Sequence, residues 1–161
     1  SLGAKFRQPG DRDDLAAAER TIREWLATKG IDSQGMVFEN GSGLSRLERI
    51  SARQMASLLQ QAWESRFAAE LIASLPLIAM DGTMRRRLGK AGMAGLGHIK
   101  TGSLKNVRSI AGFTRDENNT TWAVVAMVNH HQAWRTETIL DSVIKQVHLA
   151  ARPPSIDTAR H

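Results

Sequence analysis

The residues best suited to chemistry lie in one short stretch, His98-Ile99-Lys100-Thr101-Gly102-Ser103-Leu104. It sets an ammonium group, a hydroxyl group and a position without a side chain next to one another. A Lys-Thr-Gly tripeptide often occurs by chance and means little alone. Here it lies in a predicted strand, after a glycine-rich segment and before a tight turn. This setting makes it the strongest candidate site in the sequence.

This stretch is the first of three predicted strands, which are His98–Leu104, Val107–Thr114 and Thr121–Asn129. The third strand is apolar on both faces, so we expect it to be covered on both sides. A final helix is predicted to provide the cover, because four of its apolar residues recur at helical spacing: Leu140, Val143, Ile144 and Val147.

The first 75 residues are predicted to be helical with one glycine-rich interruption. Asp13 or Asp14 can cap a first helix, which Gly30 ends. Ser51 and Gln54 have the spacing of a capping box for a second helix. Residues 76–97 are rich in glycine and basic side chains, and we interpret them as a flexible connector that leads into the first strand.

The composition limits the classes of protein to consider. The chain has 161 residues, no cysteine and a formal net charge of +6. It is long enough for one domain or a piece of one, and the lack of cysteine excludes disulfides and thiol catalysis. The charge favours anionic partners. The densest basic run, Arg85-Arg86-Arg87, contains no aromatic residue for stacking on bases, so we do not expect nucleic-acid binding. No apolar run is long enough to predict a membrane span.

Several motifs occur in one order along the chain: Gly41-Ser42-Gly43-Leu44-Ser45-Arg46, Leu75-Pro76-Leu77, Asp81-Gly82-Thr83, Lys100-Thr101-Gly102-Ser103-Leu104 and Ala111-Gly112-Phe113. Their order and spacing resemble the class C low-molecular-mass penicillin-binding proteins, the D-Ala-D-Ala carboxypeptidase/endopeptidase family. The resemblance runs from about the first helix to the last. One departure is Asn40, where the family pattern leads us to expect an acid.

The resemblance implies a role for each residue of the Lys-Thr-Gly-Ser stretch. Lys100 would place an ammonium in the site, favouring a deprotonated hydroxyl nearby and attracting the carboxylate of the substrate. Thr101 would donate a hydrogen bond to that carboxylate, and Gly102 would let a peptide lie along the strand. The backbone N–H of Ser103 would be an oxyanion donor. Lys100 and Ser103 are thus the catalytic candidates, and Thr101 and Gly102 bind substrate. No cofactor is implied.

The family's nucleophile is not in this sequence at the expected place. The resemblance requires a serine in an S-x-x-K motif and an S-x-N motif, both before the Lys-Thr-Gly strand, so we expect both upstream of Ser1. No S-x-N occurs in the chain, and its single S-x-x-K, Ser142–Lys145, follows the strand and lies within the predicted last helix. We interpret this S-x-x-K as a coincidence. The chain alone is therefore expected to be inactive.

The predicted fold class is α/β of the β-lactamase/transpeptidase type, as a partial, C-terminal copy: an antiparallel sheet flanked by helices, with a mainly helical subdomain. We expect residues 1–97 to form the helical part with its connector, residues 98–149 to form three strands and the last helix, and residues 150–161 to form a loose tail. The intact enzyme would act on peptidoglycan peptides and bind β-lactams in the periplasm. Because two strands would be missing, we expect the chain to self-associate or to be marginally stable.

A metal site is set aside, and one alternative function remains open. His130 and His131 would point to opposite faces of a strand, which disfavours a shared metal ion, so no metal site is predicted. The rival function is a non-catalytic basic module that binds an anionic polymer.

Overall fold

The computed structural model describes residues 1–43 and 45–150, so the predicted tail lies almost entirely outside the described residues. The chain forms two compact units, Ser1–Gln61 and a second that begins at Ala62, and each is treated by itself. The boundaries expected after residues 97 and 149 stay predictions. No helix among the described residues is both long and apolar enough to span a bilayer.

The first unit contains α1 (Leu2–Lys5), α2 (Asp14–Thr28) and most of α3 (Ala52–Trp63). Asp13 caps α2, because its side chain accepts a 2.8 Å hydrogen bond from the N–H of Ala16. The capping box of α3 is also confirmed: the N–H of Ser51 donates to Gln54 at 2.9 Å, and the N–H of Gln54 donates to Ser51 at 3.2 Å.

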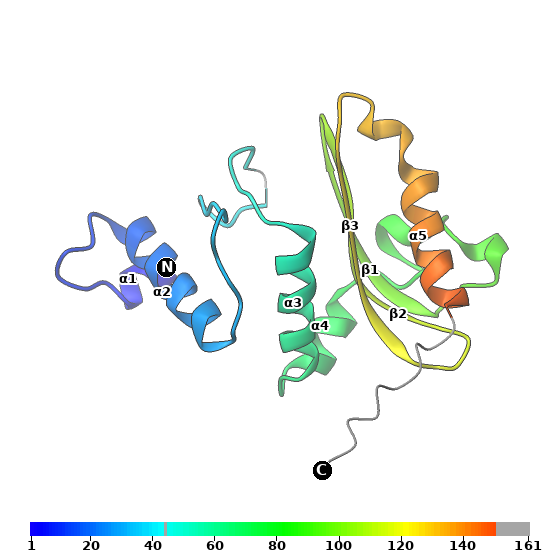
Figure 1. Ribbon diagram of the computed structural model, residues 1–161, viewed down its shortest axis with the longest axis horizontal. Helices are drawn as coiled ribbons and strands as arrows, with labels where there is room; N and C mark the ends of the chain where they lie inside the picture. The colour runs from blue at the N-terminus through cyan, green and yellow to red at the C-terminus, as the bar shows by residue number, and fades with distance from the viewer. Residues whose placement is uncertain (44, 151–161) are drawn as a thin grey trace, which may run out of the picture. The chain divides into compact units, whose positions relative to one another are not determined.

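The second unit is a three-stranded antiparallel sheet with a helix on one face (Figure 1). Its elements, in chain order, are α4 (Ala68–Ser74), the 3₁₀ turns η1 (Gly82–Met84) and η2 (Gly89–Ala91), strands β1 (Gly97–Leu104), β2 (Val107–Arg115) and β3 (Thr121–Asn129), η3 (Ala133–Arg135) and α5 (Glu137–Leu149). The three predicted strands and the last helix are thus confirmed. The order β1-β2-β3 leaves β1 at one edge of the sheet.

The core of this unit lies between the sheet and α5. Each strand contributes one buried residue, Ile99, Ile110 or Val124, and these pack with Leu140 and Ile144 of α5. The glycine-rich segment before β1 also enters this core, with four buried side chains: Ile78, Met84, Leu88 and Met93. The expectation of a flexible connector is therefore wrong, because a segment that buries so much apolar surface is held in place.

An ion pair fixes the same segment to the last helix. Arg87 donates to Asp141 of α5 through Nε at 3.0 Å and Nη2 at 2.7 Å. Both side chains are largely buried, with 11% and 17% of their surface exposed. Both donors reach the same carboxylate oxygen, Oδ1. Because the pair is largely withdrawn from water, removing one partner would leave a desolvated charge.

The turn between β2 and β3 is organised by the buried Asp116. Its carboxylate accepts hydrogen bonds from the indole of Trp122 at 2.9 Å and from the N–H groups of Asn118 and Thr120 at 2.9 and 2.8 Å. These donors, the Trp122 indole first, hold the pKa of Asp116 below its usual value. The turn thus stabilises the pairing of β3 with β2 above the carboxylate's ordinary pKa and loses that contribution as the pH falls through the lowered one.

Glycines occur where β1 and β2 approach each other closely, and two of them, Gly112 and Gly102, meet different kinds of neighbouring atom. A methyl group on Gly112 would collide with the backbone carbonyl of His98, which cannot move without breaking the strand pair. A methyl group on Gly102 would collide with the hydroxyl of Ser109, its partner across the strands. Packing within the strand pair therefore gives a reason for glycine at position 102 that does not depend on a bound peptide.

We predict that Gly102→Ala destabilises the chain by roughly 1 kcal/mol or more through overpacking. Ser109→Ala removes the obstructing hydroxyl, so Gly102→Ala in the Ser109→Ala background should cost clearly less. Chemical denaturation of the wild type, both single variants and the double variant gives the coupling energy. Purely additive effects would show that the Ser109 hydroxyl rotates away and does not set the constraint.

Candidate active site

The outer edge of β1 is paired only at its beginning. The N–H of Ile78 donates to Gly97 O at 2.9 Å, and the N–H of Ile99 donates to Pro76 O at 2.8 Å. Because N–H groups alternate in direction along a strand, those of Thr101 and Ser103 point the same way as that of Ile99, away from β2. Neither has a hydrogen-bond acceptor among residues 1–43 and 45–150. The edge from Thr101 to Ser103 is therefore free.

The four predicted site residues all lie on this edge strand, but they do not all face the same space. Lys100 is exposed and its Nζ donates to the carbonyl of Thr101 at 2.7 Å. Thr101, Gly102 and Ser103 line a pocket of about 300 Å³, and Lys100 is not among its lining residues. The structure thus places the ammonium beside the strand edge, separate from the pocket.

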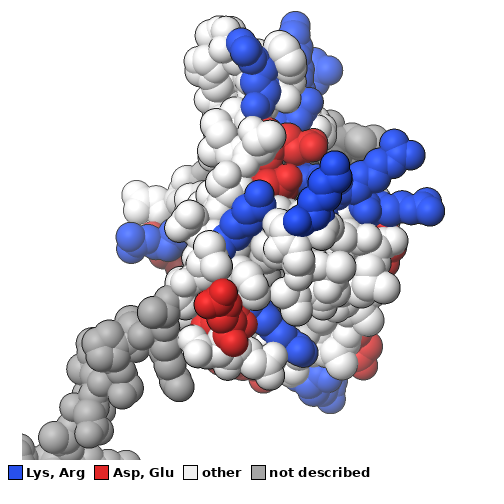
Figure 2. Space-filling view, turned by 90° about the vertical axis from the view of Figure 1, so that its right-hand side faces the viewer, with Lys and Arg blue, Asp and Glu red and all other residues white. Residues whose placement is uncertain are grey.

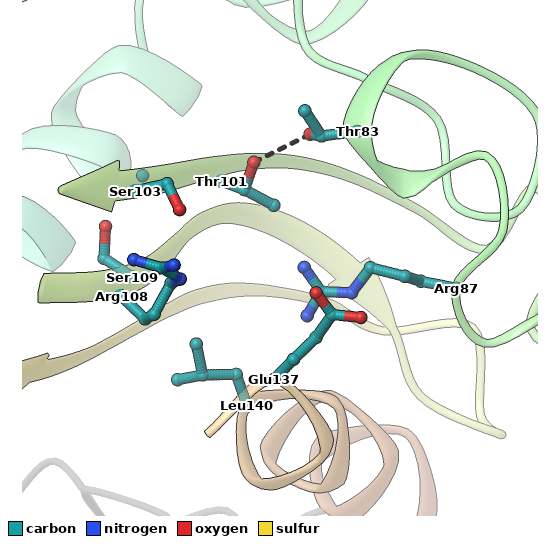
Figure 3. Close-up of a pocket in the computed structure, with 9 residues that line it drawn as sticks. Thr83, Arg87, Thr101, Ser103, Arg108, Ser109, Glu137 and Leu140 are labelled. Atoms are coloured by element: carbon teal, nitrogen blue, oxygen red, sulfur yellow. Dashed lines mark hydrogen bonds between the residues drawn. The ribbon is translucent and has the colours of Figure 1, made fainter. Parts of the chain in front are cut away.

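The pocket lies between the end of β1, the start of β2 and the first turn of α5 (Figure 3). Hydroxyl groups and charged side chains provide most of its polar lining: Thr83, Thr101, Ser103, Ser109, Arg87, Arg108 and Glu137. Leu140 adds an apolar surface that is continuous with the core. The size and polar lining of the pocket suit a small charged group.

Thr83 belongs to the site, although the sequence analysis did not identify it as a site residue. The hydroxyl of Thr101 donates to that of Thr83 at 2.7 Å, and Figure 3 shows the Thr101 hydroxyl pointing toward η1. Thr83 is held in place because the nearby Asp81 side chain accepts a 2.6 Å hydrogen bond from the N–H of Leu77. The Asp81-Gly82-Thr83 motif was the available signal, since it stands at a fixed place before Lys100 in the motif order.

The two arginines of the pocket were also not predicted as site residues. Arg87 reaches the pocket from the segment before β1, where the pattern indicated only a basic run, and it is neutralised by Asp141. Arg108 is the residue of β2 that faces Ser103 in the strand register. The hairpin signal at Lys105-Asn106 fixes this register, so the pairing of Arg108 with Ser103 was available from the sequence.

The segment that provides Arg87 carries an excess of positive charge. Arg85, Arg86 and Lys90, next to Arg87, are exposed and have no acidic partner in the described part of the chain. Figure 2 shows Lys and Arg side chains gathered over the upper part of one face, around a small acidic group. Such a surface attracts anionic ligands.

The remaining sequence candidates lie outside this site. Ser142 is in the middle of α5, where its hydroxyl donates to the carbonyl of Thr138 at 2.9 Å. His130 and His131 follow the end of β3, and their rings stack with centroids 4.0 Å apart, so they do not point to opposite faces as strand residues would. Among the described residues no group of three His, Asp or Glu side chains is placed to hold a metal ion.

Comparisons with known proteins agree on one family. The model of the D-Ala-D-Ala carboxypeptidase 3 (S13) family matches residues 5–148. A D-alanyl-D-alanine carboxypeptidase of Actinomadura sp. (strain R39) is 32% identical over 97 residues, which are 57% of this chain and 18% of that protein. The D-alanyl-D-alanine carboxypeptidase DacB of Haemophilus influenzae is 28% identical over 119 residues, 73% of this chain and 25% of that protein. The chain thus spans a quarter or less of these relatives.

Solved structures show the same fold. Penicillin-binding protein 4 from Haemophilus influenzae matches with a TM-score of 0.69 at 23% identity, covering 81% of this chain and 31% of that one. A predatory endopeptidase from Bdellovibrio bacteriovorus, acylated by penicillin G, matches with a TM-score of 0.63 at 20% identity, covering 91% and 45%. The predicted α/β fold of the transpeptidase type, in partial copy, is confirmed.

The edge strand with its Lys-Thr-Gly-Ser sequence, the ordered motifs around it and the family match over residues 5–148 lead to one conclusion. This chain belongs to the D-Ala-D-Ala carboxypeptidase 3 (S13) family of low-molecular-mass penicillin-binding proteins.

Proposed function

We propose that this chain is the C-terminal part of a serine D-Ala-D-Ala carboxypeptidase or endopeptidase that acts on peptidoglycan stem peptides in the periplasm and binds β-lactams. The observation that supports the proposal is the free edge of β1 from Thr101 to Ser103, which has the geometry needed to pair with an extended peptide as a further strand. The matched relatives are carboxypeptidases by name, and one related structure is acylated by penicillin G. None of these matches supports the alternative of a basic polymer-binding module.

In this proposal the N–H of Ser103 is an oxyanion donor. It lies on the free edge, and a carbonyl oxygen placed against it would be stabilised as negative charge develops. The attacking serine comes from polypeptide outside this chain, and its own N–H is the second donor. The serine first forms an ester with the acyl group of the penultimate residue and releases the terminal D-alanine; water then hydrolyses the ester.

In this proposal Lys100 and Thr101 interact with the reacting hydroxyl and with the carboxylate of the substrate. The exposed ammonium of Lys100 has only the neutral carbonyl of Thr101 as a described partner, so it is free to interact with a reacting hydroxyl. The hydroxyl of Thr101 donates to Thr83 in the absence of substrate. With a carboxylate bound, Thr83 would donate to Thr101 instead, and Thr101 would donate to the substrate.

The first test is covalent labelling with a fluorescent penicillin. We expect the 161-residue chain to remain unlabelled, because the nucleophile is supplied by other polypeptide, and the full-length protein that contains it to be labelled stoichiometrically. Denatured protein is the control for non-specific reaction. Labelling of the 161-residue chain itself, or failure of the folded full-length protein to react, would contradict the proposal.

The second test removes the ammonium of the edge strand in the full-length protein. Lys100→Met should lower the rate constant of acylation by about 100-fold or more, the scale of a lost proton-transfer or charge-stabilising group. Lys105→Met, at the exposed turn between β1 and β2, is the matched control and should leave the rate unchanged. Equal rates for wild type and Lys100→Met would remove Lys100 from the mechanism.

A further inference from the structure

Four exposed cations form a surface that is not used by the candidate active site. Arg85, Arg86 and Lys90 lie close together in the segment before β1. Lys145 lies on α5 and is also exposed. No ion pair among the described residues includes any of the four, and none of them lines the pocket beside β1. We call these four residues the cationic platform.

The backbone under the platform is held in place. Met84 and Leu88 lie on either side of Arg85 and Arg86, and both are buried in the core under α5. Lys90 follows within the short turn η2. The charged side chains therefore extend from a fixed backbone, so a ligand that binds them pays for ordering side chains and not for ordering a loop.

The ion pair between Arg87 and Asp141 adds Lys145 to the platform. Because Arg87 donates to Asp141 at 2.7 Å, this face of α5 lies against the segment. Residues four apart on a helix share a face, so Lys145 lies one turn beyond Asp141 on the same side. Figure 1 shows the segment, in green, beside α5. That side of the molecule faces the viewer in Figure 2, where Lys and Arg side chains gather over its upper part.

The arrangement of the charges fits a ligand with several negative groups. Charges of one sign held near one another repel, so the platform does not stabilise the folded chain. Asp141 is already paired with Arg87, and Asp81, the acid that precedes Arg85 in the sequence, accepts a hydrogen bond from the N–H of Leu77. A single anion gains little from an exposed cation in water. A polymer that contacts several cations at once gains far more.

We propose that the cationic platform is a docking surface for the carboxylates of polymeric peptidoglycan. This inference rests on the proposed function, which supplies the polymer: its stem peptides end in free carboxylates, so neighbouring stems present a row of negative charges. Thr83 and Arg87 line the pocket and belong to the same segment, so a polymer held on the platform lies beside the edge of β1. The platform takes no part in bond making or breaking, and it favours the polymer over small soluble ligands.

Cosedimentation of the 161-residue chain with purified, insoluble peptidoglycan tests the proposal. The wild type should bind, and its affinity should fall steeply as NaCl is raised from about 50 to 500 mM, because salt screens exposed charges. The triple variant Arg85→Gln/Arg86→Gln/Lys90→Gln should bind about tenfold or more weakly, the combined effect of three weak contacts. Adding Lys145→Gln should weaken binding further. Thermal midpoints of both variants should equal or exceed that of the wild type, because repulsion is relieved.

The matched control removes the same charge from other elements of the second unit. Arg66, Lys105 and Arg135 are exposed and lie before α4, in the turn between β1 and β2, and in η3. Arg66→Gln/Lys105→Gln/Arg135→Gln should bind peptidoglycan like the wild type. Equal weakening in the control and the platform variant would show that only net charge matters and would overturn the proposal.

Two further ligands decide which anion is bound. Peptidoglycan whose carboxylates have been converted to amides should no longer retain the wild type. Phosphodiester polymers keep their charge in that reaction, so undiminished binding would assign the ligand to phosphate groups and overturn the proposal. Vesicles containing phosphatidylglycerol should not retain the chain; retention that depends on the platform would make a membrane surface the partner instead.

Acylation by penicillin G separates this inference from the proposed function. In the full-length protein the platform variant should be acylated at the wild-type rate, because penicillin is small and does not need the docking surface. Normal acylation together with unchanged peptidoglycan binding in the platform variant overturns this inference alone. Failure of the wild-type full-length protein to be acylated overturns the proposed function, whatever the binding shows.

Discussion

The incomplete pairing of the outer edge of β1 is the constraint on which the rest of the site depends. Residues 76–78 close the outer edge at Gly97 and Ile99 and go no further, so the strand is anchored at its start and free from Thr101 onward. Backbone N–H groups are left without partners only where water or a ligand can reach them. A strand whose edge is both rigid and open is therefore suited to pair with a peptide. The Lys-Thr-Gly-Ser sequence lies on the open part of β1.

The rigidity comes from the segment before β1. Its buried side chains join the core under α5, and the Arg87–Asp141 pair ties it to the helix. This places Thr83 against Thr101 and directs Arg87 into the pocket, so side chains from distant parts of the chain meet beside one strand edge. Loops that carry function commonly depend on such anchoring to a scaffold.

Strand alternation, turn residues and helical spacing were enough to predict β1, β2, β3 and α5, because each is a local pattern. The segment of residues 76–97 was misinterpreted for a physical reason: its buried residues follow no period, and Leu88 adopts a left-handed conformation, φ 63°, that glycine would more often supply. The glycines of this segment were interpreted as a sign of flexibility, but several of them form turns. Of the site, the edge strand was predictable, whereas the Thr83–Thr101 contact and the pairing of Arg87 depend on tertiary packing.

The most direct test of the free edge is amide hydrogen exchange of the 161-residue chain, resolved by residue. The amide of Ile99, bonded to Pro76, should exchange slowly, and those of Thr101 and Ser103 should exchange at least about tenfold faster, since an unpaired edge amide needs no opening event. Lys100 and Gly102, whose N–H groups face β2, are the internal reference for slow exchange. Protection of Thr101 and Ser103 equal to that of Ile99 would show that the edge is covered and would contradict the account.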